Sequence, residues 1–376
     1  RSAFQYSEPT GPRPVTMSEW ANRLDVLADY YLTATERLHI GFRPLDEEGQ
    51  FSGYTFEGRN EGWNDGFNIQ PRNLFVEGEL GEIFPRWDQN DKLSLDYGFS
   101  IGRQPISFQE GIMIADNLDG IGIARNNMFM FGSSATRIST FWAPDNIHRG
   151  DNVRDRRAQL FGLFTQHDFD KSTIEVDGAY VSGGRHAGDG AYAGVARIRR
   201  HGYWNSTLRA NASWALQEES AAISDGYLIT HELSRTMKHN EDIVYLNIFY
   251  GIGDYTSAAR DPSAGGPLGR MGLLYQAVGL GTFGAPLGNR SSESVGFALG
   301  YQHFIFGEEG DQQVIFEVGG RTPTSSDNEE LAEFGFGARY QRALNRHAIF
   351  VLDGYVTHDE AGDTGYGARS EIRMKY

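Results

Sequence analysis

The chain of 376 residues contains no cysteine, which excludes a disulfide framework and any metal site with thiolate ligands. It has no run of about 18 consecutive apolar residues, so we expect no membrane-spanning helix. Its mean hydropathy is −0.47, and proline is sparse, at 12 residues. Positive charge is in deficit: 34 Lys and Arg face 50 Asp and Glu. The net charge of −16 argues against a nucleic-acid partner, which would need a basic surface.

Motifs of enzymes and cofactor sites are also missing from the sequence. Gly279, Gly281 and Gly284 spell GxGxxG, but no βαβ pattern surrounds them. The ten histidines show no metal-ligand spacing, and no GxSxG motif of a serine hydrolase is present. We therefore expect no cofactor, no bound metal and no enzymatic activity.

Glycine and aromatic residues are abundant instead. The chain has 47 Gly, 18 Tyr and 24 Phe, and aromatic residues make up 13% of it. This composition favours strands over helices. The sequence therefore predicts an all-β protein.

The chain ends in GARSEIRMKY, a segment with two chemically different faces. Ala368, Ser370, Ile372 and Met374 alternate with Arg369, Glu371, Arg373 and Lys375. Period-two alternation over about ten residues is typical of a strand. The same pattern recurs at 30–43, 174–180, 192–199, 207–216, 314–321 and 334–341.

The two kinds of face predict two different environments. The apolar faces hold small and aromatic residues, as the lipid-facing band of a transmembrane β-barrel does, and the polar faces are rich in arginine. We predict that the apolar faces contact lipid and that the charged faces line a lumen. A soluble all-β protein, such as a sandwich or a propeller, is the alternative.

The connections between these segments alternate in length. The short ones are DFDKS, HGYWN, MKHNED, GEEGDQ and ALNRH, and the longer ones cover 46–70, 104–117, 143–156, 257–294 and 322–331. Such alternation places short periplasmic turns on one rim and long extracellular loops on the other. The sequence therefore predicts a transmembrane antiparallel β-barrel of about sixteen strands, with a range of about fourteen to eighteen. We expect residues 1–25 to form a periplasmic or lumenal segment that includes a short helix, and residues 26–376 to form the single barrel.

Two stretches resemble a known class of outer-membrane protein. The terminal Tyr376, after Ile372 and Met374, resembles the C-terminal signature of Gram-negative outer-membrane proteins. The segment SIGRQPISFQEGIMIADNLDGIGIARN, with Gly-Arg-Gln at 102–104 and Leu-Asp-Gly-Ile at 118–121, is similar to the GRQ-loop-FDGV stretch of alginate-export-like and OprD-like porins. The resemblance implies a channel in the outer membrane of a Gram-negative bacterium, with a constricted, arginine-lined lumen and infolded loops. Relatives of the first type pass an anionic polysaccharide, and those of the second take up small carboxylates and amino acids.

Alternation assigns a set of charged residues to the lumen. The candidates are Arg37, Arg43, Arg197, Arg199, Arg209, Arg321, Arg339, Arg369 and Arg373, with Glu77, Glu79, Glu175, Asp177, Glu317, Asp353 and Glu371. Arg103 and Arg125 join them if a bend at Gly102 or a bulge turns them inward, because strict alternation directs both at lipid. Arginine rings favour anions in a pore. The alternative is that these charges pair with each other and brace the barrel.

The sequence thus predicts a porin through which small hydrophilic solutes, mainly small-molecule or oligosaccharide anions, diffuse passively. The alternatives are a structural barrel that sheathes or anchors a partner protein and an outer-membrane hydrolase. We expect contacts with membrane lipid and lipopolysaccharide, and either a homo-oligomer or an outer-membrane partner is compatible with the pattern. The long glycine-rich loop within 255–294 is expected to fold into the barrel mouth or, alternatively, to contact a partner or lipopolysaccharide.

Overall fold

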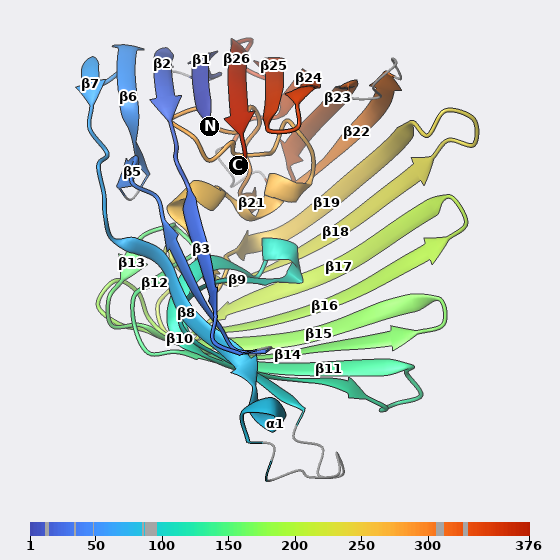
Figure 1. Cartoon of the computed structure of the whole chain (residues 1–376). Helices are drawn as coiled ribbons and strands as arrows, with labels where there is room; N and C mark the ends of the chain where they lie inside the picture. Colours follow the sequence, from blue (N-terminus) through green and yellow to red (C-terminus); the bar gives the residue numbers. More distant parts are fainter. Residues whose placement is uncertain are drawn as a thin grey trace.

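The computed structural model describes residues 1–11, 15–33, 35–47, 49–84, 86, 96–305, 312–325 and 330–376. Within these ranges it contains 26 strand segments, one short α-helix, α1 (Leu80–Ile83), and three 3-10 turns. No helix in the described part of the chain has the length and the apolar character needed to cross a membrane. The strands surround a central space, and the two termini lie side by side (Figure 1).

Long strands that pair with their neighbours in chain order form most of the wall. Each is antiparallel to the next. In order, they are β9 (Tyr97–Phe108), β10 (Ile114–Met128), β11 (Ala135–Ala143), β14 (Gln159–Phe169), β15 (Ser172–Ser182), β16 (Gly190–His201), β17 (Trp204–Ala215), β18 (Gly226–Thr236), β19 (Ile243–Tyr255), β22 (Ser294–Ile305), β23 (Gln312–Pro323), β24 (Glu333–Asn345), β25 (Ala348–Asp359) and β26 (Thr364–Met374).

The N-terminal segment is part of this wall, which corrects the prediction of a separate helical segment at 1–25. β1 (Ser2–Glu8) pairs with β26 on one side and with β2 (Met17–Asn22) on the other. β3 (Val26–Tyr31) follows β2 after three residues. The outward rings of Phe4 and Trp20 stack. Pairing between the first and last strands of the chain therefore decides the structure of this segment.

The sheet has two ends: one is β3, and the other lies beyond β2 on the side away from β1. At the first end, β3 pairs with β4 (Arg37–Phe42), β4 pairs with β8 (Pro71–Glu79), and β8 pairs with β9. At the second end, β2 pairs with β6 (Gln50–Glu57). The short strands β5 (Asp46–Glu47) and β7 (Gly62–Asn64) both pair with β6. No pairing among the described strands joins β3 or β4 to β6 or β7. The all-β antiparallel fold is confirmed. The structure does not confirm the predicted strand number or hydrogen-bonded closure of the ring.

Long loops gather on one rim of the wall. They contain β12 (Ile147–His148), β13 (Arg154–Asp155), β20 (Ala259–Arg260), β21 (Ser291–Ser292) and the 3-10 turns η2 (Pro262–Ala264) and η3 (Pro267–Arg270). Two predicted loops differ: 46–70 contains β5, β6 and β7, and 104–117 continues β9 and β10 up to the 3-10 turn η1 (Gln109–Gly111). Most of the predicted turn GEEGDQ and part of the loop at 322–331, residues 326–329, lie outside the described residues.

The two faces of the strands differ as the alternation predicts. On β26, Ile372 and Met374 are exposed, whereas Arg369 and Glu371 are buried on the opposite face. Exposed Phe334 and Phe336 on β24 alternate with buried Gly335 and Gly337 in the same way. An exterior of aromatic and aliphatic side chains around an interior of charge is the pattern of a barrel in a bilayer.

Candidate functional site

The loop between β19 and β22 folds into the ring and narrows its interior. The Glu317 carboxylate on β23 accepts hydrogen bonds from the main-chain N–H groups of Leu273, at 2.9 Å, and Leu274, at 2.8 Å, and from the hydroxyl of Tyr245. Leu274 packs on inward glycines of β23 and β24; a Cβ on Gly337 would lie 3.1 Å from its Cδ2. The structure therefore places this loop inside the mouth, anchored to the wall by a strand carboxylate.

The hairpin of β9 and β10 also bends inward, and its tip is η1. Gln109, Glu110 and Gly111 all have positive φ, at 50°, 55° and 83°. The Gln109 amide donates to Asp177 Oδ2 on β15 at 2.6 Å, and the Ser257 hydroxyl donates to the carbonyl of Ile112 at 2.6 Å. A left-handed backbone at a residue other than glycine costs about 1–3 kcal/mol, so these contacts hold a strained tip in place.

Four charged side chains from four elements meet where the hairpin tip approaches the infolded loop. Glu110 on η1 lies 2.5 Å from an Nη atom of Arg270 on η3 and 3.5 Å from one of Arg209 on β17. Glu232 on β18 lies 2.9 Å from Arg209 and 3.7 Å from Arg270. We call this set the latch cluster. Its alternating charges join both inward segments to the wall at the narrow part of the ring.

A second charged row runs across β24, β25 and β26. Arg339 contacts Asp353 at 2.6 Å, Asp353 contacts Arg369 at 2.5 Å, and Arg369 contacts Glu371 at 2.5 Å. Glu371 also pairs with Arg373, at 3.0 Å, and with Arg1, at 2.5 Å. This arginine row has four guanidinium groups against two carboxylates, so it carries excess positive charge on the inner face.

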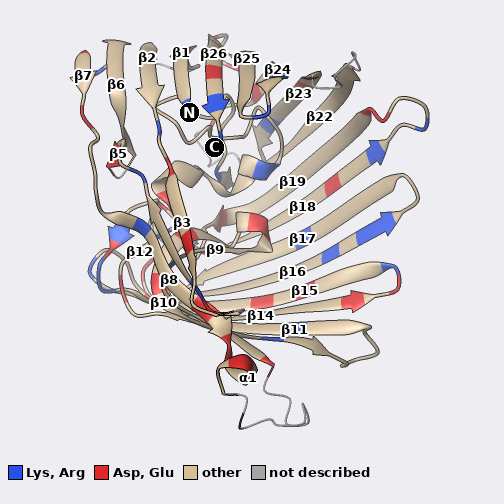
Figure 2. Cartoon of the chain, in the orientation of Figure 1, with Lys and Arg blue, Asp and Glu red and all other residues tan. Residues whose placement is uncertain are grey.

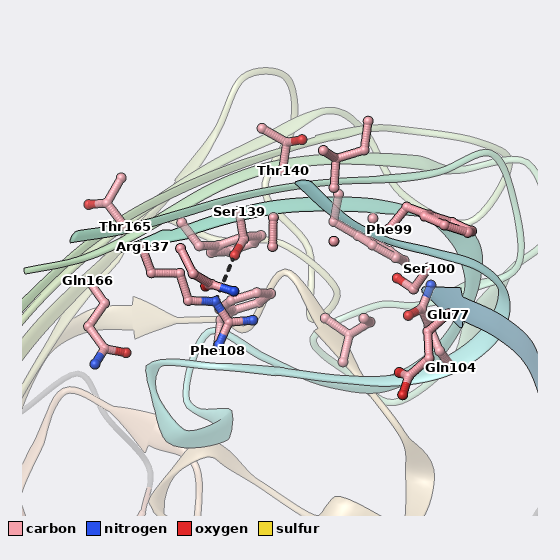
Figure 3. A pocket seen from close by; sticks show the side chains of 18 of the residues that line it. Glu77, Phe99, Ser100, Gln104, Phe108, Arg137, Ser139, Thr140, Thr165 and Gln166 are labelled. Carbon is pink, nitrogen blue, oxygen red and sulfur yellow. Dashed lines mark hydrogen bonds between the residues drawn. The ribbon is translucent and has the colours of Figure 1, made fainter. Parts of the chain in front are cut away.

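A chamber of about 960 Å³ lies on the other side of the interior, between the hairpin tip and the wall from β8 to β15 (Figure 3). Arg137 on β11 is the one basic residue in its described lining, and its Nε donates to Ser139 at 3.2 Å. The Glu175 carboxylate makes no hydrogen bond or ion pair with a described residue. The acidic lining residues are Glu77, Glu79, Asp96, Glu110, Glu175 and Asp177.

The remaining predicted inner residues occupy smaller paired clusters. Arg37 lies 2.5 Å from Glu77 across β4 and β8. Arg43 is buried, with ion pairs of 2.8 Å to Asp25 and 3.0 Å to Asp46. Arg321 contacts Glu330 and Ser294 beneath the infolded loop. Within the described chain, no group of three or more His, Asp or Glu residues could hold a metal ion.

The structure places Arg197 and Arg199 on the outer face, not in the lumen. They are exposed on β16 together with Val195, whereas Tyr192 and Gly194 face inward. The assignment by face composition fails here because these small and aromatic residues pack against the hairpin tip and not against lipid: a Cβ on Gly194 would lie 2.8 Å from Gln109 Cγ. Both arginines lie near the rim of short turns, where long side chains can extend toward water.

Arg103 and Arg125 also lie on the outer face, as strict alternation requires. Gly102 has the expected unusual backbone, with φ of 127°, but the pairing of β9 with β10 continues through it without a shift. Arg103 pairs with Asp119 at 2.6 Å, on the same face as exposed Ile121. Arg125 stacks over Tyr97 with 5.1 Å from Cζ to the ring centre. The predicted inward turn of these two residues is wrong.

Sequence reasoning missed three residues of the latch cluster. Glu232 carries a usable signal, since Thr230 and Glu232 alternate with the apolar Ile229 and Leu233 in YLITHELSRT. Glu110 and Arg270 carry none, because both lie in stretches that were predicted to be loops and their position depends on how those segments fold inward.

No family model and no curated protein matches the chain. Solved structures with the same fold do exist. Acinetobacter baumannii OccAB3 superposes with a TM-score of 0.66 at 7% identity, covering 100% of this chain and 97% of that one. Pseudomonas aeruginosa OccK2 (OpdF) gives 0.61 at 9% identity, with 100% and 96% covered, and OccK1 (OpdK) gives 0.61 at 8% identity, with 99% and 96% covered.

The structure therefore has the fold of an outer-membrane β-barrel with infolded loops. The fold is OprD-like, as the resemblance in sequence predicts, and the resemblance is confirmed at the level of the fold. The location in the outer membrane of a Gram-negative bacterium stays a prediction.

Proposed function

We propose that the chain is a passive channel that lets small hydrophilic solutes, anions above all, diffuse across the outer membrane through an arginine-lined lumen. The observation that carries this proposal is the arginine row of Arg339, Arg369, Arg373 and Arg1, whose guanidinium groups outnumber their carboxylate partners on the inner face. Arginine keeps its charge and presents a planar fork that fits carboxylates. An anion that loses water in the narrow ring gains contacts with the accessible members of this row, Arg1, Arg339 and Arg373, whereas Arg369 is fully buried.

The acidic chamber stands opposite this wall and gives the interior a transverse field. Glu175 and Asp177 on β15 and Glu110 on η1 supply negative charge on one side, while β24 to β26 supply the positive charge. A polar solute would orient its negative end toward the arginine row as it passes. The latch cluster and the infolded loop would set the size limit.

We further propose that the ring is closed in the membrane by the continuous segment of β2 and β3. β3 is one end strand and pairs with β4, and it continues along the chain from β2, which pairs with β1 on one side and β6 on the other, so β2 and β3 together bridge the two ends of the sheet. A closed ring leaves no unpaired backbone groups in lipid, where each costs several kcal/mol, roughly 2–7 by transfer.

Current recordings across a planar bilayer test this function. Purified full-length chain, inserted under a KCl gradient, is expected to give discrete current steps and a reversal potential of the sign set by chloride. A reversal potential of the potassium sign would refute anion preference. Inserted protein that gives no current steps would refute the channel itself.

A further inference from the structure

The outer wall carries an apolar groove on four adjacent strands. Its volume is about 540 Å³, and its lining comes from β10, β11, β14 and β15. Pairing places Ile121, Trp142, Phe161 and Tyr180 in one row across the strands, and Ile123, Thr140, Leu163 and Gly178 in the next. The first row is bulky throughout, whereas the second contains the small Thr140 and Gly178. The groove is the space that these two positions leave empty on a face directed at lipid.

Basic residues lie on the loop rim directly beyond this groove. Arg156 and Arg157 precede β14, and Arg185 follows β15, the two strands that supply Phe161 and Tyr180. All three are exposed, and within the described chain none of their guanidinium groups makes a hydrogen bond or ion pair. In Figure 2, Lys and Arg positions, coloured blue, occur in the loops beside β12. This is free positive charge at the edge of the membrane-facing band.

One buried carboxylate fixes the spacing of these arginines. Asp155 accepts hydrogen bonds from the main-chain N–H groups of Arg157, at 3.2 Å, and Arg185, at 3.1 Å, on the same oxygen, and also from Gly184 and His186. Burial alone would raise the pKa of Asp155, but these backbone donors outweigh it and lower the pKa. The ionised carboxylate therefore ties the two loops together and holds two arginines side by side.

Acidic groups near the rim are already engaged. Asp119 pairs with Arg103 at 2.6 Å, and Asp151 pairs with His186 at 2.6 Å. Asp189 accepts hydrogen bonds from the Tyr180 hydroxyl and from the Gly183 N–H, both at 2.7 Å. The arginines at 156, 157 and 185 are thus left to bind an external anion.

We propose that this face binds a lipopolysaccharide molecule of the outer leaflet: an acyl chain occupies the groove, and the phosphates of the glycolipid head contact Arg156, Arg157 and Arg185. The occupant must join an apolar chain to a multiply charged anionic head, because the groove and the unpaired arginines adjoin at the membrane surface. The proposal rests on the outer-membrane location in the proposed function and on the orientation expected from the sequence, with long loops outside, and does not depend on transport.

Binding of labelled lipid A to the full-length protein in detergent tests the proposal. The charge-reversal variant R156E/R157E/R185E should weaken binding by about a hundredfold, since each basic residue near an anionic lipid surface contributes about 1 kcal/mol. Gly178→Trp, which fills the groove at a position where a Cβ meets only the Tyr192 carbonyl at 3.9 Å, should weaken binding by about tenfold. The matched control R197E/R199E, on the outer face at the opposite rim, should bind as the unchanged protein does.

Three further ligands distinguish binding of lipid A at this site from binding of any lipid or any phosphate. Dephosphorylated lipid A should bind the unchanged protein about as weakly as lipid A binds the triple variant, and phosphatidylethanolamine and inorganic phosphate should not compete. The proposal would be overturned if the triple variant bound lipid A as tightly as the unchanged protein, or if the control R197E/R199E lost as much affinity as the triple variant. It would also be overturned if phosphatidylethanolamine or inorganic phosphate displaced labelled lipid A as well as unlabelled lipid A does. Conductance should be unchanged in the triple variant, so failure here is distinct from failure of the channel function.

Discussion

Arg369→Met is expected to lower the stability of the barrel by about 3 kcal/mol, because removing one member of a buried ion pair leaves its partners charged and uncompensated. The Arg369 side chain is fully buried, and it contacts both Asp353 and Glu371 at 2.5 Å. Glu371 is fully buried as well. Urea unfolding in phospholipid bilayers, followed by tryptophan fluorescence, measures this loss.

Arg373→Met is the matched control for this experiment. Arg373 pairs with the same Glu371, at 3.0 Å, but its side chain is 35% exposed. An ion pair open to water contributes at most about 1 kcal/mol. Equal losses of stability in the two variants would contradict the claim that burial of Arg369 sets the cost of removing it.

Glu110→Gln is expected to raise the fraction of time spent in a wider conducting state by about fivefold. Glu110 joins the hairpin tip to Arg270 and Arg209, and both Glu110 and Arg270 are more than 40% exposed. Two such pairs together contribute about 1 kcal/mol, which corresponds to that change in ratio. The strained backbone of the tip then favours its release from the wall. Single-channel recordings resolve the two states.

Glu175→Gln separates loss of the latch from loss of charge. It removes one negative charge from the same chamber, but Glu175 makes no ion pair with a described residue. Both variants should shift ion selectivity toward anions to a similar extent, and only Glu110→Gln should change the dwell times. Identical current records from the two variants would mean that the hairpin tip is held by its packing and not by the latch cluster.

The sequence predicts the two faces of most wall strands, because apolar and charged side chains alternate along each strand. The inward positions of Arg209, Asp177, Arg339 and Asp353 follow from period-two alternation alone. The assignment fails on β16, where Tyr192 and Gly194 resemble lipid-facing residues but contact the hairpin tip. Small and aromatic side chains suit both lipid and an infolded segment, so the composition of a face cannot distinguish the two.

The N-terminal strands and the latch cluster depend on contacts between distant parts of the chain. The segment MSEWANRLDVLADY is rich in helix-forming residues, yet pairing of β1 with β26 and β2 recruits it into the wall. Tertiary pairing here outweighs local propensity. Glu110 and Arg270 form an ion pair only because two loops fold inward, and the spacing of these residues in the sequence does not predict that contact.

Spin labelling on β15 tests the central claim, that lipid contacts the outside of this wall and water fills its interior. The absence of cysteine allows single labels at Val176, which is exposed on the outer face, and at Glu175, which lines the chamber. In lipid vesicles, the label at 176 should be relaxed by oxygen and shielded from a water-soluble nickel chelate, and the label at 175 should show the reverse. Equal access of the chelate to both labels would contradict the account.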